Sequence, residues 1–177
     1  WRRVMENWRD TKIHIILGGN RCLHGDTLIR SDDQLIPISK IEEHLRSTTD
    51  FTNPKHNVLG FNTNGKHSEF QYRASLPFSK GILPCVKIEI SGLLTTHTFI
   101  CSEDHKVLSF SGRWIAAKDL QKGQKLQCEL GRDAYKTVKR ITSAGMHECW
   151  DMEVDDVHNY YAQGCFHHNS TKSTFAN

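Results

Sequence analysis

Two short segments near opposite ends of the chain combine residue types that could break and re-form peptide bonds. Cys22 begins the stretch CLHGDTLI, and the pair His168-Asn169 is followed directly by Ser170. A thiol and a hydroxyl both accept acyl groups, and an asparagine side chain can cyclise onto its own backbone carbonyl. These residues therefore indicate chemistry at two peptide bonds, Arg21–Cys22 and Asn169–Ser170.

The same residues suggest an ordered reaction. Cys22 would attack the carbonyl of Arg21 and convert the amide into a thioester, which requires surroundings that strain or polarise that bond. Ser170 would take over the acyl group as an ester, and cyclisation of Asn169 would break the 169–170 bond. The free amine of Ser170 would then attack its own ester. The products would be an Arg21–Ser170 peptide bond and a released fragment, 22–169.

Histidines are the candidates for moving protons in these steps. His105, in the stretch SEDH, is the first choice to protonate the leaving nitrogen at the first bond. His97 is a rival for that role. His168, beside Asn169, and His158 could carry protons during cyclisation.

Four segments, in order along the chain, resemble the sequence blocks of inteins, the self-splicing insertions that have the Hint (hedgehog/intein) fold. These segments are 22–29, 100–126, 149–164 and 167–170. The resemblance implies an all-β, horseshoe-like fold of many short strands with one or two short helices. It also implies splicing in cis as a single-turnover autocatalyst, with no cofactor and no resident metal.

The resemblance assigns two further residues. Asp151 stands where inteins use an aspartate to coordinate the steps. Ser102 stands where they usually have threonine, so this chain departs from the pattern but keeps a hydroxyl. Only residues 129–148 fill the place where larger inteins hold a homing endonuclease, so the chain resembles a mini-intein. The expected division is a flank at 1–21, the mini-intein at 22–169 and a flank at 170–177.

The two flanks, joined, resemble an interrupted phosphate-binding loop. They give ILGGNR-STKST, close to the GxxxxGK[ST] pattern of P-loop NTPases except that Thr171 replaces a glycine. Gly18, Lys172 and Ser173 would bind phosphates and magnesium after splicing. The loop resembles that of phage and viral large-terminase ATPases. ATP and nucleic acid would then be partners of the spliced host protein only, and the precursor would have no P-loop activity.

Composition sets broader limits. A length of 177 residues suits one domain with short tails, and we expect a monomer whose only partners are its own flanks, with no small-molecule substrate. The net charge of +3 contains no run of Lys or Arg that would favour nucleic acid. Six cysteines without CxxC spacing favour a reducing compartment, the cytoplasm of a bacterial or virus-infected cell. The apolar run 13–17 is too short to cross a membrane. The chain begins with Trp1, so we expect it to be part of a longer protein.

Short runs of β-branched and apolar residues between turn signals predict most elements to be strands. The expected strands are 13–17, 27–29, 58–61, 85–90, 98–101, 106–110, 125–128, 152–154 and 160–162. The expected helices are 38–45, after Pro37, and 116–121. Residues 46–57 are expected to form an exposed loop and 131–142 a polar connector. The residues expected in the core are Cys85, Cys101, Trp114, Cys128 and Trp150.

Three other functions compete with splicing. A hedgehog-like autoprocessing domain would pass the thioester to an outside nucleophile, and the intact His168-Asn169-Ser170 argues against it. A P-loop module could carry an inert insertion. A cysteine hydrolase could use Cys22 and His105 on added substrates. A zinc site is a further alternative, although its residues fit no standard finger spacing: His147, Cys149, Cys165, His167 and His168.

Overall fold

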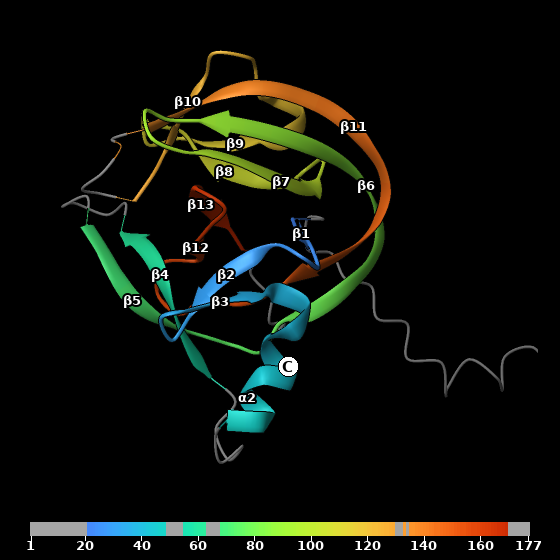
Figure 1. Cartoon of the computed structure of the whole chain (residues 1–177), viewed down its shortest axis with the longest axis vertical. Coiled ribbons are helices and arrows are strands. Elements are labelled where there is room, and N and C mark those ends of the chain that lie inside the picture. Colours follow the sequence, from blue (N-terminus) through green and yellow to red (C-terminus); the bar gives the residue numbers. More distant parts are fainter. Residues whose placement is uncertain (1–20, 49–54, 63–67, 130–132, 134, 170–177) are drawn as a thin grey trace, which may run out of the picture.

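The computed structural model describes residues 21–48, 55–62, 68–129, 133 and 135–169. Most of them lie in strands, with one α-helix and two short 3₁₀-helices, which confirms the prediction of an all-β chain (Figure 1). Some predictions fall outside the described residues. These are the strand at 13–17, the flank boundaries beyond Arg21 and Asn169, and the roles of Gly18, Ser170, Lys172 and Ser173.

The first sheet includes β1, the first strand of the described chain, as one of its members. Its strands, in spatial order, are β1 (Leu23–His24), β7 (Thr96–Ser102), β6 (Phe78–Ser91), β11 (Tyr135–Asp151) and β10 (Lys125–Gln127). Because β1 also pairs with β11, it is bonded on both sides. The long β6–β11 pair has three register irregularities, and such bulges bend a sheet. The pair therefore arches over β1 (Figure 1).

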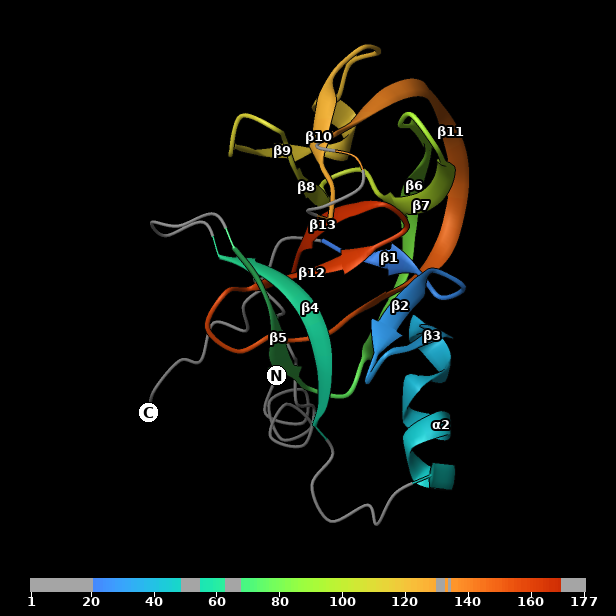
Figure 2. The same cartoon turned by 60° about the vertical axis from the view of Figure 1, so that its left-hand side comes forward.

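The second sheet includes β12 and β13, the last two strands of the described chain. Its strands, in spatial order, are β5 (Ser68–Ala74), β4 (His56–Asn62), β2 (Leu28–Ser31), β12 (Asn159–Ala162), β13 (Cys165–His168), β8 (Lys106–Leu108) and β9 (Trp114–Ala116), with β3 (Gln34–Pro37) paired to β2. A tight turn joins β12 to β13, and both turn residues, Gln163 and Gly164, have positive φ angles, as type I′ hairpins require. This hairpin lies on the concave side of the β6–β11 arch (Figures 1 and 2).

The helices are short and lie outside the sheets. The predicted helix at 38–45 is confirmed as η1 (Ile38–Lys40) continued by α2 (Ile41–Thr48), which stands beside β3 (Figure 2). The prediction at 116–121 is confirmed only as one 3₁₀ turn, η2 (Ala117–Asp119). In the part of the chain that the structure describes, no helix is both long and apolar enough to cross a membrane.

Three sequence predictions were wrong. The polar connector at 131–142 is, from Tyr135 onward, the first half of β11. Its polar side chains are accommodated because β6 and β10 satisfy the backbone on both edges while one face meets solvent. The expected strand at 152–154 contributes only an isolated bridge from Val154 to Ala74. The loop at 46–57 is shorter than expected, because α2 extends to Thr48 and β4 begins at His56; residues 49–54 lie outside the described ranges.

The two sheets share one apolar core, to which Leu23 and Val86 come from the first sheet and Ile29, Val107 and Tyr160 from the second. Cys85, Cys101 and Cys128 are buried, as predicted. Trp114 and Trp150 are only partly buried, and each packs against the margin of a core cluster. The prediction that both tryptophans lie in the core was therefore too strong.

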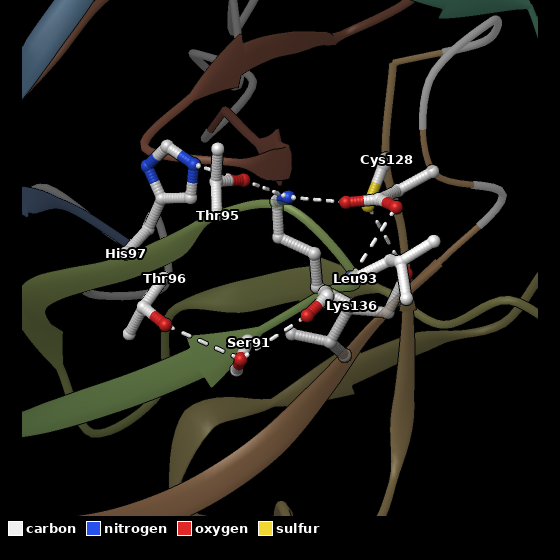
Figure 3. A network of polar contacts seen from close by, with 10 residues as sticks. Ser91, Leu93, Thr95, Thr96, His97, Cys128 and Lys136 are labelled. Carbon is white, nitrogen blue, oxygen red and sulfur yellow. Dashed lines mark hydrogen bonds and ion pairs between the residues drawn. The ribbon is translucent and has the colours of Figure 1, made fainter.

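A partly buried polar network, in which the Asp133 and Lys136 side chains are buried, ties the turn between β6 and β7 to the start of β11 (Figure 3). Lys136 Nζ donates to Thr95 Oγ1 at 2.7 Å and pairs with Asp133 Oδ2 at 3.2 Å. Asp133 Oδ1 in turn accepts the backbone N–H of Leu93 at 3.3 Å. His97 lies in this network, with Nε2 at 3.2 Å from Thr95 Oγ1.

Candidate active site

The pairing of β1 places Cys22 between two other predicted residues. Leu23 pairs with Cys101 of β7 on one side and with Trp150 of β11 on the other. One residue earlier, Cys22 therefore lies next to the ends of both strands, Ser102 and Asp151. All three side chains are buried. The backbone N–H of Cys22 donates to Ser102 Oγ at 3.2 Å, and the Ser102 N–H donates to the Cys22 carbonyl at 3.0 Å.

The Cys22 side chain lies in a small cluster of thiols. Cys22, Cys85 and Cys149 pack together, and the Cys85 and Cys149 sulfurs are 3.3 Å apart. Burial raises the pKa of Cys85 to about 12, and a hydrogen bond with Cys22 raises that of Cys149 further. Because the thiolate is the nucleophilic form, these two neighbours stay protonated and inert at neutral pH.

His105 lies in a rigid turn at the first junction. Its backbone N–H donates to the Ser102 carbonyl at 3.0 Å, and its carbonyl accepts the N–H of Ala117 at 2.7 Å. The ring is fully buried, and its Nε2 lies 2.9 Å from Nδ1 of His167. Burial and the neighbouring histidines hold the pKa of His105 well below its usual range, although the nearby Arg21 backbone acts in the opposite direction. The ring is therefore neutral at pH 7 and adjoins the Arg21–Cys22 bond.

Asn169 and His168 lie at the end of β13. Asn169 is fully buried, and its N–H donates to the His158 carbonyl at 3.1 Å. His168 Nδ1 lies 2.5 Å from the Asn169 carbonyl oxygen, to which only a protonated nitrogen can donate. Burial lowers the pKa of His168, so the neutral ring carries its proton on Nδ1. This contact polarises the carbonyl that asparagine cyclisation would attack.

Comparison with known proteins identifies the family and the fold of the chain. A sequence profile described as the pretoxin HINT domain matches residues 60–172. The chain belongs to this HINT domain family. The predicted Hint fold is thereby confirmed. No curated protein matches the sequence.

Solved inteins have the same fold as this HINT domain. A DnaB intein from Synechocystis sp. PCC 6803 has a TM-score of 0.71 at 18% identity, covering 85% of this chain and 99% of that one. The DnaX mini intein from Spirulina platensis has a TM-score of 0.65 at 25% identity, covering 84% and 100%. A bacterial intein-like domain from Clostridium thermocellum has a TM-score of 0.67 at 17% identity, covering 84% and 99%.

Four buried side-chain atoms in the described part of the HINT domain have no hydrogen-bond partner, and all belong to this region. They are His105 Nδ1, Tyr160 Oη, and both Oδ1 and Nδ2 of Asn169. A buried polar group without a partner costs about 1–3 kcal/mol. Such groups are rare in folded proteins. All four atoms belong to residues at or beside the two predicted junctions.

His158 is exposed, unlike most of the other predicted site residues of the HINT domain, which are buried. Its φ is positive at 53° and its side chain is exposed, while its carbonyl holds Asn169. It lies close enough to His168 to add a small contribution to the lowered pKa of that residue, which is due mainly to burial. The predicted proton-carrying role of His158 stays a prediction.

Sequence reasoning missed two residues of the HINT domain site. The sequence predicts Tyr160 to lie in a strand and in the third intein-like segment, and His167 to lie in the fourth segment and in the alternative zinc set. It assigns neither residue a part in the reaction. Within the described residues, no group of three or more His, Cys, Asp or Glu side chains could hold a metal ion. His97, the rival of His105, lies beside Thr95 and Lys136 (Figure 3).

Proposed function

We propose that this domain splices itself out of its host in cis, releasing 22–169 and joining Arg21 to Ser170. The observation that supports this most is that both junctions share one buried site. The hydrogen bond between His105 and His167 links the turn beside Arg21–Cys22 to β13, which ends at His168, directly before Asn169. Two bonds that must break in sequence can thus be served by one set of buried groups.

In the first step, the Cys22 thiol attacks the Arg21 carbonyl carbon. The thiol proton passes to the vacant Nδ1 of His105, and the C–S bond forms as the carbonyl electrons move to oxygen. The tetrahedral adduct then collapses. The C–N bond breaks, and His105 returns the proton to the Cys22 nitrogen, which becomes a free amine. Ser102, already bonded to that nitrogen, holds it in place, and Asp151 lies beside it.

The later steps take place at the other junction. The Ser170 hydroxyl attacks the thioester, and the Cys22 thiol leaves with the proton. Asn169 Nδ2 then attacks its own backbone carbonyl, which His168 polarises. The 169–170 bond breaks, and the proton lost from Nδ2 reaches the Ser170 nitrogen, with His158 as the proposed carrier. The ester finally rearranges to the Arg21–Ser170 amide.

The proposed host is a P-loop ATPase, and within that class the large subunit of a phage or viral terminase. The support is the joined sequence ILGGNRSTKST, which would bring Gly18, Lys172 and Ser173 into one loop. Residues 22–169 separate Gly18 from Lys172 in the precursor. Nucleotide binding should therefore appear only after splicing.

The family match favours a second candidate. A pretoxin HINT domain suggests processing that releases a neighbouring segment without joining the flanks. In this chain that would mean cleavage at Arg21–Cys22 by an outside nucleophile. Asn169 and Ser170 would then be dispensable.

Intact-mass spectrometry of the purified chain over time, with and without reductant, tests these functions. Splicing predicts two species, residues 1–21 joined to 170–177 and a free 22–169 fragment. Asn169→Ala should stop cleavage at 169–170 but leave Arg21–Cys22 cleavable by added thiol, and Ser170→Ala should prevent joining. Cys22→Ala is the control that should abolish both the joined product and thiol cleavage at Arg21–Cys22. Release of 1–21 without any joined product, unchanged by Asn169→Ala, would support autoprocessing instead.

A further inference from the structure

The His167 side chain lies between the two junctions, with polar contacts at both ring nitrogens. Nδ1 is 2.9 Å from His105 Nε2, and Nε2 is 3.0 Å from the Ala162 carbonyl oxygen. Phe99 meets the ring edge-on with centroids 4.9 Å apart, and Tyr160 stacks on it at 6.1 Å. The ring is fully buried, so its orientation is held on every side.

These contacts determine where the protons are. A carbonyl oxygen can only accept, so His167 Nε2 must carry a hydrogen toward Ala162. Burial lowers the pKa of His167 to about 4, which leaves one ring proton at neutral pH. Nδ1 of His167 is then an acceptor, and His105 must donate to it from Nε2. In neutral His105 this leaves a lone pair on Nδ1.

The Cys165 thiol offers one other arrangement, but the geometry disfavours it. Its sulfur is 3.4 Å from His167 Nε2 and could donate to that nitrogen if the nitrogen were bare. In that case the bare nitrogen would face the Ala162 oxygen at 3.0 Å without a proton between them. Two lone pairs at that separation repel in a buried site.

We propose that His167 is a positioning residue, which sets the tautomer and orientation of His105 so that Nδ1 presents a lone pair to the Arg21–Cys22 bond. This inference rests on the proposed splicing function and extends it to a residue outside the reacting atoms. The arrangement follows the general rule that a catalytic base is oriented by a third group.

Two nearly isosteric substitutions separate positioning from packing. His167→Asn keeps an acceptor near the position of Nδ1, whereas His167→Leu has a similar shape and no acceptor. Both are made in a full chain carrying Asn169→Ala and Ser170→Ala, which confines the reaction to the first step. We expect thiol-induced cleavage at Arg21–Cys22 to slow by roughly tenfold or more with leucine and to stay within about threefold with asparagine.

Nitrogen-15 NMR of the His105 ring reads the tautomer directly. We expect the proton on Nε2 in the parent and in His167→Asn, and a growing share on Nδ1 in His167→Leu. A parent protein with the proton on Nδ1 would overturn the proposal without any variant being needed. If both substitutions slowed thiol cleavage equally and left the His105 tautomer unchanged, His167 would act only through packing. If the parent showed the expected tautomer but no thiol cleavage, the proposed function would fail while the assignment of His105 would stand.

Discussion

Cys22 and Ser102 are joined by two hydrogen bonds that run in opposite directions. The Cys22 N–H donates to Ser102 Oγ at 3.2 Å, and the Ser102 N–H donates to the Cys22 carbonyl at 3.0 Å. The nitrogen held in this way is the leaving group of the proposed first step. The resemblance to inteins predicted that a hydroxyl is kept at this position, and in this structure the Ser102 hydroxyl makes the contact with the Cys22 nitrogen.

Ser102→Ala should slow thioester formation, because it removes the acceptor that orients the Cys22 nitrogen. Leaving the buried Cys22 N–H without this acceptor costs about 1–3 kcal/mol, which corresponds to roughly a 5- to 150-fold change in rate. Ser102→Thr keeps the hydroxyl and should stay within a few-fold of the parent. The measurement is the rate of thiol-induced release of 1–21 in an Asn169→Ala background. Equal rates for serine and alanine would remove Ser102 from the first step.

His168→Phe should block the second junction and spare the first. Phenylalanine preserves the edge contact with Trp114, whose ring centroid is 4.9 Å from that of His168. It removes the Nδ1 proton that polarises the Asn169 carbonyl, and the loss of such a donor costs roughly 100- to 1,000-fold in rate. Cleavage at 169–170 and thiol cleavage at 21–22 can be followed in one mass-spectrometric time course. Equal slowing at both bonds would point to a general defect in folding.

Tyr160→Phe should slow the first step without lowering the stability of the fold. The Tyr160 hydroxyl is buried without a partner, and burial, then Asp151 and Cys22, raise its pKa well above the usual range. Removing it should leave the free energy of unfolding unchanged or higher by about 1 kcal/mol. The first step should nonetheless slow by roughly tenfold, because this hydroxyl is placed to donate to negative charge that develops near Cys22. Chemical denaturation and thiol cleavage measure the two effects. A variant that is less stable but equally fast would contradict both expectations.

Acid should destabilise the fold through its buried histidines. The pKa of His167 is about 4 in the folded chain against about 6.5 when unfolded, so the unfolded state binds more protons between these values. The stability contributed by neutral His167 is therefore complete above pH 6.5 and is lost as the pH falls toward 4. Between pH 7 and pH 5 this loss is about 2 kcal/mol, and His105 acts in the same direction.

Urea unfolding at pH 7 and pH 5 measures this loss. The protein used carries Cys22→Ala and Asn169→Ala, so that no bond breaks during the experiment. Adding His167→Asn removes the titrating ring and should flatten the pH dependence. An identical loss of stability with and without His167 would show that other groups cause it.

Local sequence predicted many elements because their signals lie within a few residues. The Pro37 start and apolar spacing of 38–45 predicted η1 and α2, and β-branched runs predicted the centres of β4 and β7 and the second half of β6. Local reading failed at Tyr135–Asp151, where polar residues suggested a connector. That segment is a strand because β6 pairs with it along most of its length and β10 pairs with its start. The residues of the segment alone do not indicate that these partners exist.

The sequence by itself determined the residue types at the two junctions, Cys22 and His168-Asn169, and the order of the segments that resemble inteins. Only the tertiary structure decided how they meet. The pairing of β1 with β7 and β11 brings Cys22 beside Ser102 and Asp151. The pairing of β13 with β8 brings His167 onto His105, 62 residues away in the chain. Element type depends on near neighbours along the chain, whereas these contacts depend on strand register between distant segments, for which a single sequence carries no local signal.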